Sequence, residues 1–282
     1  MTPSVRSSRP RKSLGQHFLH DSRVVQRIVD AAELNADDTL IEIGPGRGAL
    51  TRRLVRMAGR VIAVELDPDL SEELPHRLDH PSNLECVMGD AREIELYSLV
   101  ATTFGDAAPR YKVVGNLPYY AASPIIRRTL ESKAPPALAL FMVQKEVAES
   151  MTAKPGSMGL LSVATQFYAE ARTVCTVPPS AFRPAPKVRS AVVRLDIRGA
   201  PAISVESREE FFKVVRAGFS APRKQLHNSI SHGLGIKSSL GSAILERAAI
   251  DGRRRPATLD LAEWGDLYRA WRETEEDRTL GG

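Results

Sequence analysis

The first two-thirds of the chain alternate short apolar runs with stretches of helical spacing, and this alternation limits the fold more than any other feature. Four of the runs are rich in Val and Ile, which is typical of strands buried on both faces of a sheet. Between the runs, apolar residues recur at the spacing of one helix face. Such alternation predicts an α/β fold with a doubly wound parallel sheet. The predicted strands are Thr39–Ile43, Arg60–Leu66, Leu84–Met88, Tyr111–Gly115 and Leu138–Val143.

The segments on either side of these strands also have recognisable patterns. Asp21 is the predicted N-cap of a first helix, because its carboxylate can accept backbone N–H groups. Two longer β-like runs follow the strands, at Leu160–Ala169 and Val188–Ile197. Four prolines between these two runs exclude a central strand or a helix interior from the connection. The first helix is predicted to bury Val24, Val25, Ile28, Val29 and Ala32.

After Gly199–Pro201 the pattern becomes entirely helical. Ser207 and Glu210 have the spacing of a capping box at the start of a helix. We therefore predict two domains, a sheet domain over residues 1–199 and a small helical domain over residues 200–282. The last helix is predicted to place on one face Leu261, Trp264, Leu267, Tyr268 and Trp271.

Composition excludes several classes of protein. The 282 residues are 43% apolar, enough to bury a core, and the longest apolar run, Ala137–Val143, is too short to span a bilayer. Cys86 and Cys175 form no Cys-x-x-Cys pair, which argues against a zinc site or a disulfide scaffold and favours a reducing compartment. Residues 1–12 superficially resemble a transit peptide. A secretory signal is excluded, because no apolar segment follows these residues. Membrane, secreted and fibrous proteins are thus excluded, and no metal is expected.

The net charge of +5 is unevenly distributed. The segment Arg172–Arg198 contains six basic residues and one acid, a second basic stretch runs from Lys213 to His227, and a third is Arg253–Arg255. Basic clusters in distant segments suit a polyanionic partner such as nucleic acid. A solvated basic surface explains the charge equally well.

Three successive predicted strands end in residues that suit a nucleoside. The first runs into Gly44-Pro-Gly46-Arg-Gly48, where glycines let the backbone turn tightly and approach a ligand. The second ends at Glu65, which can accept both hydroxyls of a ribose. The third is followed by Asp90, whose carboxylate can accept from an adenine amino group. The G-x-G-x-G spacing differs from the dinucleotide motif and suits a cofactor without a pyrophosphate, such as S-adenosylmethionine.

The fourth strand ends in Asn116-Leu117-Pro118-Tyr119. An exocyclic adenine amine is a poor nucleophile, because its lone pair is delocalised into the ring. Acceptors for its two N–H bonds turn the lone pair toward a sulfonium methyl, and the Asn116 side chain and the Leu117 carbonyl can supply them. Pro118 stiffens the turn, and Tyr119 offers a face on which a base can stack. The tetrapeptide thus predicts methyl transfer to an adenine amine.

In these motifs the sequence resembles the ribosomal RNA adenine dimethyltransferase family, and within it the small-subunit enzymes. The motifs occur in family order from residue 12 to about residue 230, which argues against a transit peptide. They are Lys12-Ser-Leu-Gly-Gln-His-Phe-Leu19, Glu42-Ile-Gly-Pro-Gly-Arg-Gly-Ala-Leu-Thr51, Glu65-Leu-Asp67, Gly89-Asp90-Ala91, Gly115-Asn-Leu-Pro-Tyr119, Val177–Ser190 and Phe219–Leu226.

The resemblance implies a Rossmann-like sheet of seven strands with the last antiparallel, and S-adenosylmethionine as cofactor. It implies dimethylation at N6 of two adjacent adenosines in the 3′-terminal hairpin loop of small-subunit rRNA, within a pre-ribosomal small subunit. A cytoplasmic monomer is expected. Tyr119 and Phe182 would enclose the target adenine, and His17 stands where Asn is common. The implied cofactor contacts are His17, Leu19, Gly44, Glu65, Asp90 and Asn116.

Three other functions fit parts of the sequence. A large-subunit rRNA methyltransferase of the macrolide-resistance type shares the cofactor and the chemistry, although Leu117 and Leu14-Gly15 favour the small-subunit type. A non-catalytic nucleic-acid binder on the same fold does not explain the intact Glu65 and Asn116–Tyr119. A nicotinamide dehydrogenase fails on the glycine spacing.

Overall fold

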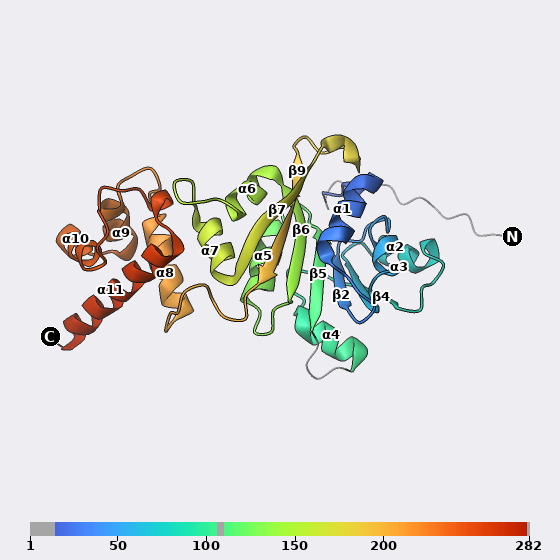
Figure 1. Cartoon of the computed structure of the whole chain (residues 1–282), viewed down its shortest axis with the longest axis horizontal. Coiled ribbons are helices and arrows are strands. Elements are labelled where there is room, and N and C mark those ends of the chain that lie inside the picture. The colour runs from blue at the N-terminus through green and yellow to red at the C-terminus, as the bar shows by residue number, and fades with distance from the viewer. Residues whose placement is uncertain (1–14, 106–109, 281–282) are drawn as a thin grey trace. The chain divides into compact units, whose positions relative to one another are not determined.

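The computed structural model describes residues 15–105 and 110–280 (Figure 1). The predicted transit-like segment and the first three residues of the Lys12 motif lie outside these ranges. The described chain packs into two compact units, one of residues up to 148 together with 171–197, and one of residues 149–170 together with 198 onward. Sequence reasoning had placed residues 149–170 with the sheet. No described helix is long and apolar enough to cross a membrane.

A seven-stranded sheet forms the centre of the first unit within the described residues, in the order β4-β3-β2-β5-β6-β9-β7. The first five strands in this order pair in parallel, and β9 pairs antiparallel with β6. The predicted sheet with an antiparallel last strand is therefore confirmed. The strands are β2 (Thr39–Ile43), β3 (Arg60–Glu65), β4 (Leu84–Met88), β5 (Tyr111–Asn116), β6 (Leu138–Gln144), β7 (Ala169–Val177) and β9 (Ser190–Ile197).

The first helix, α1 (Ser22–Ala32), begins as predicted. The Asp21 carboxylate accepts from the backbone N–H groups of Arg23 at 2.8 Å and Val24 at 3.4 Å. Its five predicted apolar residues are buried and pack with strand residues in one hydrophobic cluster. The other helices of this unit are α2 (Thr51–Leu54), α3 (Pro68–Arg77), α4 (Leu96–Phe104), α5 (Ala122–Glu131) and the start of α6 (Lys145–Met151).

Two expectations about strands are wrong. Strand β4 is not buried on both faces, because it lies at the edge of the sheet, and its Met88 is 65% exposed. The run Leu160–Ala169 is not a strand but the helix α7 (Leu160–Tyr168). Ser162 stabilises the start of α7, since its hydroxyl accepts from Gly159 N at 2.8 Å and donates to Ser150 O at 2.6 Å. A short apolar run has no periodicity that separates a buried helix from a strand.

The second unit is helical and has an aromatic core. Phe167 and Phe211 stack with centroids 4.9 Å apart, and Trp264 and Tyr268 of the last helix are buried as predicted. Only half of the predicted capping box forms. Ser207 Oγ accepts from the backbone N–H of Glu210, but the Ser207 N–H donates to the Tyr268 hydroxyl instead of the Glu210 side chain. The helices after residue 198 are α8 (Arg208–Gly218), α9 (Leu226–Leu234), α10 (Ser238–Arg247) and α11 (Leu261–Leu280).

Candidate active site

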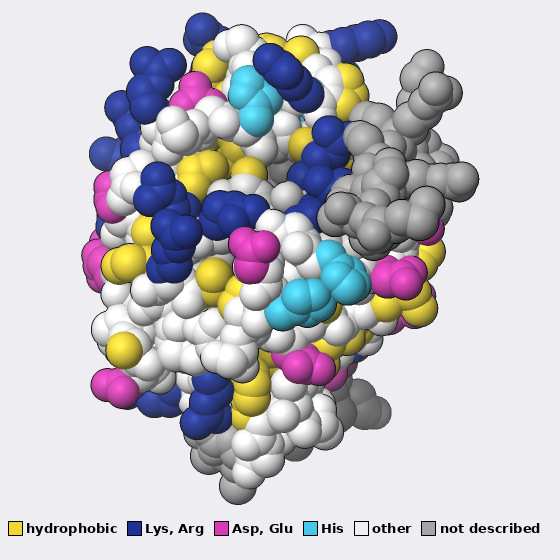
Figure 2. Space-filling view, turned by 90° about the vertical axis from the view of Figure 1, so that its right-hand side faces the viewer, with side chains coloured by type: hydrophobic (Ala, Val, Ile, Leu, Met, Phe, Trp, Pro, Cys, Tyr) yellow, Lys and Arg dark blue, Asp and Glu magenta, His cyan; other side chains and the backbone are white. Residues whose placement is uncertain are grey.

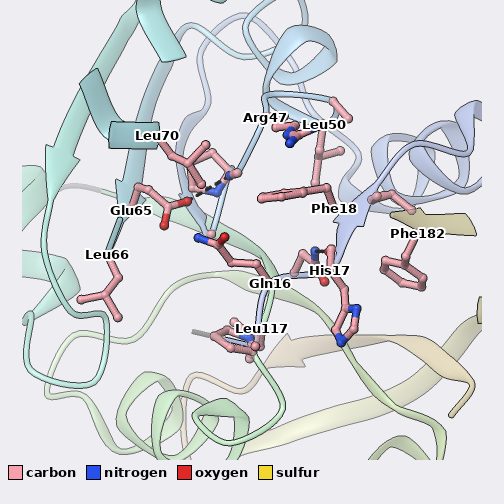
Figure 3. A pocket seen from close by; sticks show the side chains of 18 of the residues that line it. Gln16, His17, Phe18, Arg47, Leu50, Glu65, Leu66, Leu70, Leu117 and Phe182 are labelled. Atoms are coloured by element: carbon pink, nitrogen blue, oxygen red, sulfur yellow. Dashed lines mark hydrogen bonds between the residues drawn. The ribbon is translucent and has the colours of Figure 1, made fainter. Parts of the chain in front are cut away.

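A pocket lies at the carboxyl ends of β2, β3 and β5, where open α/β sheets bind ligands (Figure 3). The strand register pairs Ile43 with Val64 on one side and with Gly115 on the other. The next residues, Gly44, Glu65 and Asn116, therefore lie side by side where the strands end. The predicted residues that line this pocket are His17, Leu19, Gly44, Glu65, Asn116, Leu117, Pro118, Tyr119 and Phe182.

The turn after β2 strongly favours glycine at two positions. Gly44 has φ +70° and Gly46 has φ +56°, in the left-handed region that other residues seldom adopt. A Cβ on Gly44 would lie 3.0 Å from the Asn116 carbonyl oxygen, and one on Gly46 would lie 2.9 Å from the Phe18 ring. The turn thus leaves space that side chains would fill, as a nucleoside cradle requires.

Glu65 is held in a fixed position at the end of β3. Its carboxylate accepts from the backbone N–H groups of Gly46 and Asp67, both at 3.0 Å, and the residue is 8% exposed. Burial raises the pKa of this carboxyl above its usual value. A carboxylate has about four acceptor positions, so the backbone contacts do not use all of them and a ribose hydroxyl can still donate to Glu65. The residues present therefore fit the nucleoside of S-adenosylmethionine.

Residues 16–19 connect three sides of the pocket. Gln16 Nε2 donates to Asp67 Oδ2 at 2.8 Å, and the His17 carbonyl accepts from Asn116 Nδ2 at 3.1 Å. Residues Phe18–Leu19 form β1, which pairs antiparallel with β8 (Phe182–Arg183). Sequence reasoning missed Gln16 and Phe18, although both lie inside a motif that it singled out.

The His17 side chain binds the proline-rich loop. Its Nδ1 lies 2.7 Å from the carbonyl oxygen of Pro184, and because a carbonyl can only accept, Nδ1 must donate. The ring lies 5.9 Å from the Tyr119 ring, centroid to centroid. In the described structure this imidazole therefore positions the loop, and its contact with the cofactor stays a prediction.

Asn116 presents an acceptor at the end of β5. Its Nδ2 faces the His17 carbonyl, which fixes the orientation of the amide and leaves Oδ1 as the acceptor. Leu117 is buried, and its N–H donates to Met142 O at 3.1 Å. Neither Asn116 Oδ1 nor the Leu117 carbonyl accepts a hydrogen bond from another residue in the described ranges. Two consecutive residues that line the pocket thus each offer an available acceptor.

The two predicted stacking residues differ in their surroundings. Tyr119 is half-buried, and its hydroxyl lies 2.8 Å from Ser190 Oγ. Phe182 is only 3% exposed and belongs to the hydrophobic cluster that contains Leu19 and Val25. It lies on the opposite side of the pocket from Glu65 (Figure 3). A stack of Phe182 on a base would require its ring to leave this cluster, so that role stays a prediction.

Asp90 does not line the pocket. Both of its carboxylate oxygens accept from the Arg92 guanidinium, at 2.6–3.0 Å, and this ion pair lowers the pKa of Asp90. The predicted contact with an adenine amino group would have to share that carboxylate with Arg92. Sequence reasoning missed this partner, which lies only two residues away.

Glu42 lies in β2, lines the same pocket and is 2% exposed. Its Oε2 has no hydrogen-bond partner among the described residues, and burial raises its pKa to about 8. At a pH between the usual value and about 8, the folded protein keeps the proton on Glu42, whereas the unfolded chain releases it. The free energy of unfolding therefore falls as the pH rises through this range.

We expect Glu42→Gln, which cannot titrate, to become progressively more stable than the wild type from about pH 5 to about pH 8. Urea unfolding of both proteins without ligand, at several pH values, measures the difference. If the free energy of unfolding changed with pH in the same way for both proteins, Glu42 would be charged in the folded state.

The family model of the ribosomal RNA adenine dimethylases matches residues 7–266. The chain belongs to this family. Ribosomal RNA small subunit methyltransferase A of Dehalococcoides mccartyi is 43% identical over 265 residues, covering 94% of this chain and 89% of the relative. The protein of the same name from Pelotomaculum thermopropionicum is also 43% identical over 265 residues, covering 92% and 90%.

Two solved structures are similar to this chain. The 23S rRNA methyltransferase ErmE is 29% identical with a TM-score of 0.71, over 90% of this chain and 98% of that one. A dimethyladenosine transferase from Plasmodium falciparum has a TM-score of 0.78 over 92% and 98%, and at 24% identity it supports the fold alone.

Proposed function

We propose that this chain transfers methyl groups from S-adenosylmethionine to N6 of two adjacent adenosines in the 3′-terminal hairpin loop of small-subunit rRNA. The observation that carries the proposal is the pair of available acceptors, Asn116 Oδ1 and the Leu117 carbonyl, at the strand end next to Glu65. Membership in the rRNA adenine dimethylase family supports adenine as the target.

The cofactor, when bound, supplies a sulfonium methyl. Glu65 would hold its ribose through the free acceptor positions of the carboxylate, and Gly44 and Gly46 would let the backbone approach it. Leu19, His17 and Asn116 line the same pocket, and Asp90 remains the proposed contact of the adenine amino group. The fixed backbone N–H groups that hold Glu65 make this ribose site ready before binding.

Asn116 and Leu117 would hold the target amine. Accepting its two N–H groups directs the nitrogen lone pair toward the methyl group, which is an orientational contribution to the rate. The alkylated amine is acidic, so it can lose its proton to water without a strong base. The target base must leave its stack to enter the pocket, where the half-buried Tyr119 offers a stacking face.

The small subunit is favoured over the large one by the relatives. The two relatives described above, at 43% identity, are both named for small-subunit rRNA. ErmE, at 29% identity, is named for 23S rRNA. Radiolabelled methyl transfer to undermethylated small subunits, naked small-subunit rRNA and large-subunit RNA tests the choice. We expect label in the small subunits, and label in large-subunit RNA alone would favour the macrolide-resistance type.

Not every cation of the Arg172–Arg198 segment is available to RNA. Arg194 is 7% exposed and is ion-paired with Glu33 and Asp196, so it cannot contact RNA. Arg183, Lys187 and Arg189 are exposed in the proline-rich loop that carries Phe182. We assign these three cations to phosphates beside the target base. On the face shown in Figure 2, Lys and Arg side chains outnumber Asp and Glu in the upper half.

In the second unit, Arg223 and Lys224 are exposed, whereas Arg253 and Arg254 are paired with Asp251 and Glu263. If Arg223 and Lys224 each neutralise one phosphate, reversing both to Glu should flatten the slope of log affinity against log salt by roughly 1.4–1.8. Binding to small subunits at several salt concentrations measures this slope, with S-adenosylmethionine affinity expected to be unchanged. A wild-type slope would show that the two cations are only solvated.

We also propose that the protein acts as a monomer in the cytoplasm, on a precursor of the small subunit. Both cysteines are free, and Cys175 is buried, as suits a reducing compartment. No three His, Cys, Asp or Glu side chains in the described ranges are grouped so that they could hold a metal ion. Sedimentation of the purified protein tests the oligomeric state.

A further inference from the structure

Ser190 is a buried polar residue that no proposed step has used. It is 1% exposed, it begins β9, and its Oγ lies 2.8 Å from the hydroxyl of Tyr119. These two residues come from segments far apart in the sequence. The hydroxyl pair therefore joins the loop after β5 to the first residue of β9.

The backbone around Ser190 is fixed. Ser190 pairs with Gln144 in the antiparallel ladder of β6 and β9, and the preceding carbonyl, that of Arg189, accepts from Lys145 N at 3.0 Å. A side chain as short as serine, on a backbone held at this point, places its oxygen with little freedom. Ser190 Oγ is thus a rigid anchor for whatever binds to it.

Tyr119 needs such an anchor. It is only half-buried, and it lies in a turn after β5 rather than in a strand. Its neighbour on the pocket side is the tilted His17 ring, 5.9 Å away, which limits its position less than close packing would. The hydrogen bond at the far end of the ring therefore fixes the position of that end.

We propose that Ser190 is a positioning residue for methyl transfer, which holds the Tyr119 ring in the position where the target adenine stacks on it. This inference rests on the proposed function, because it assigns Tyr119 to the target base. Ser190 itself touches neither the base nor the cofactor in this account. It acts only through the Tyr119 hydroxyl.

A double-mutant cycle tests whether Ser190 acts through Tyr119. Ser190→Ala and Tyr119→Phe remove the same hydrogen bond from its two ends and keep the ring. We expect each to lower kcat on undermethylated small subunits about tenfold, because a displaced stacking face misplaces the reacting amine. The double variant should be no slower than either single one, and S-adenosylmethionine affinity should not change.

Ser162→Ala is the matched control. Ser162, like Ser190, is a buried serine, and its hydroxyl makes two hydrogen bonds. It lies at the start of α7 in the second unit. Its loss should lower the melting temperature and leave kcat unchanged. Additive losses in the Ser190 and Tyr119 cycle, or wild-type kcat in Ser190→Ala, would overturn the positioning role.

A crystal structure of Ser190→Ala separates this proposal from the proposed function. We expect the Tyr119 ring to be displaced or to occupy more than one orientation, whether or not the protein methylates small-subunit rRNA. A single ring orientation identical to that of the wild type would overturn the positioning role by itself. Absence of methylation by the wild-type protein would overturn only the proposed function.

Discussion

Replacing Asn116 by alanine is expected to lower the rate of methyl transfer about 10²–10³-fold, the usual cost of losing one preorganised contact to the reacting group. The variant loses the Oδ1 acceptor, so the lone pair of the target amine is no longer directed. It also loses the hydrogen bond from Nδ2 to the His17 carbonyl, which is 3.1 Å long. Single-turnover transfer to small subunits at saturating cofactor measures the chemical step.

Cofactor affinity provides the control for this variant. Asn116 lines the cofactor pocket, so calorimetric titration with S-adenosylmethionine should show at most a modest loss. The substitution Asn116→Asp keeps an acceptor and removes the donor to His17, and it should retain more activity than Asn116→Ala. Near-normal turnover in the alanine variant would remove Asn116 from the chemistry.

The second large effect is expected at Glu65. Charge-assisted hydrogen bonds contribute roughly 1.5–3 kcal/mol each, so losing two to a ribose should weaken S-adenosylmethionine binding about 10²–10⁴-fold in Glu65→Ala. The variant also leaves the N–H groups of Gly46 and Asp67 without their acceptor. Isothermal titration calorimetry measures the affinity directly.

Glu85→Ala is the matched control for Glu65. Glu85 is an exposed glutamate on the neighbouring strand β4, outside the pocket. Its removal should leave cofactor affinity at the wild-type value. Unchanged affinity in Glu65→Ala would move the ribose site elsewhere.

Sequence reasoning located β2 to β6 well because each is a short, mostly apolar run between helical segments. The expected bounds of β2 and β4 agree with the structure, and those of β3, β5 and β6 differ by one residue. Burial was harder to predict, since it depends on which strands are neighbours. Met88 is exposed only because β4 is the edge strand.

The site was predictable where its residues follow consecutive strand ends. Gly44, Glu65 and Asn116 lie together because parallel pairing places those ends at one edge of the sheet. The pairing of β1 with β8, which buries Phe182, joins segments more than 160 residues apart and has no local signal. The contact between Ser190 and Tyr119 also has no local signal, because it follows from the register of β9.

Mapping the modified nucleotides is the most direct test of the proposed function. Small subunits that lack N6-dimethyladenosine would be incubated with the wild-type protein and S-adenosylmethionine, and their rRNA digested and analysed by mass spectrometry. The account predicts N6,N6-dimethyladenosine at two adjacent positions of the 3′-terminal hairpin loop, and none in the Asn116→Ala sample taken at the same time. Methylation confined to large-subunit RNA, or at an atom other than N6, would contradict it.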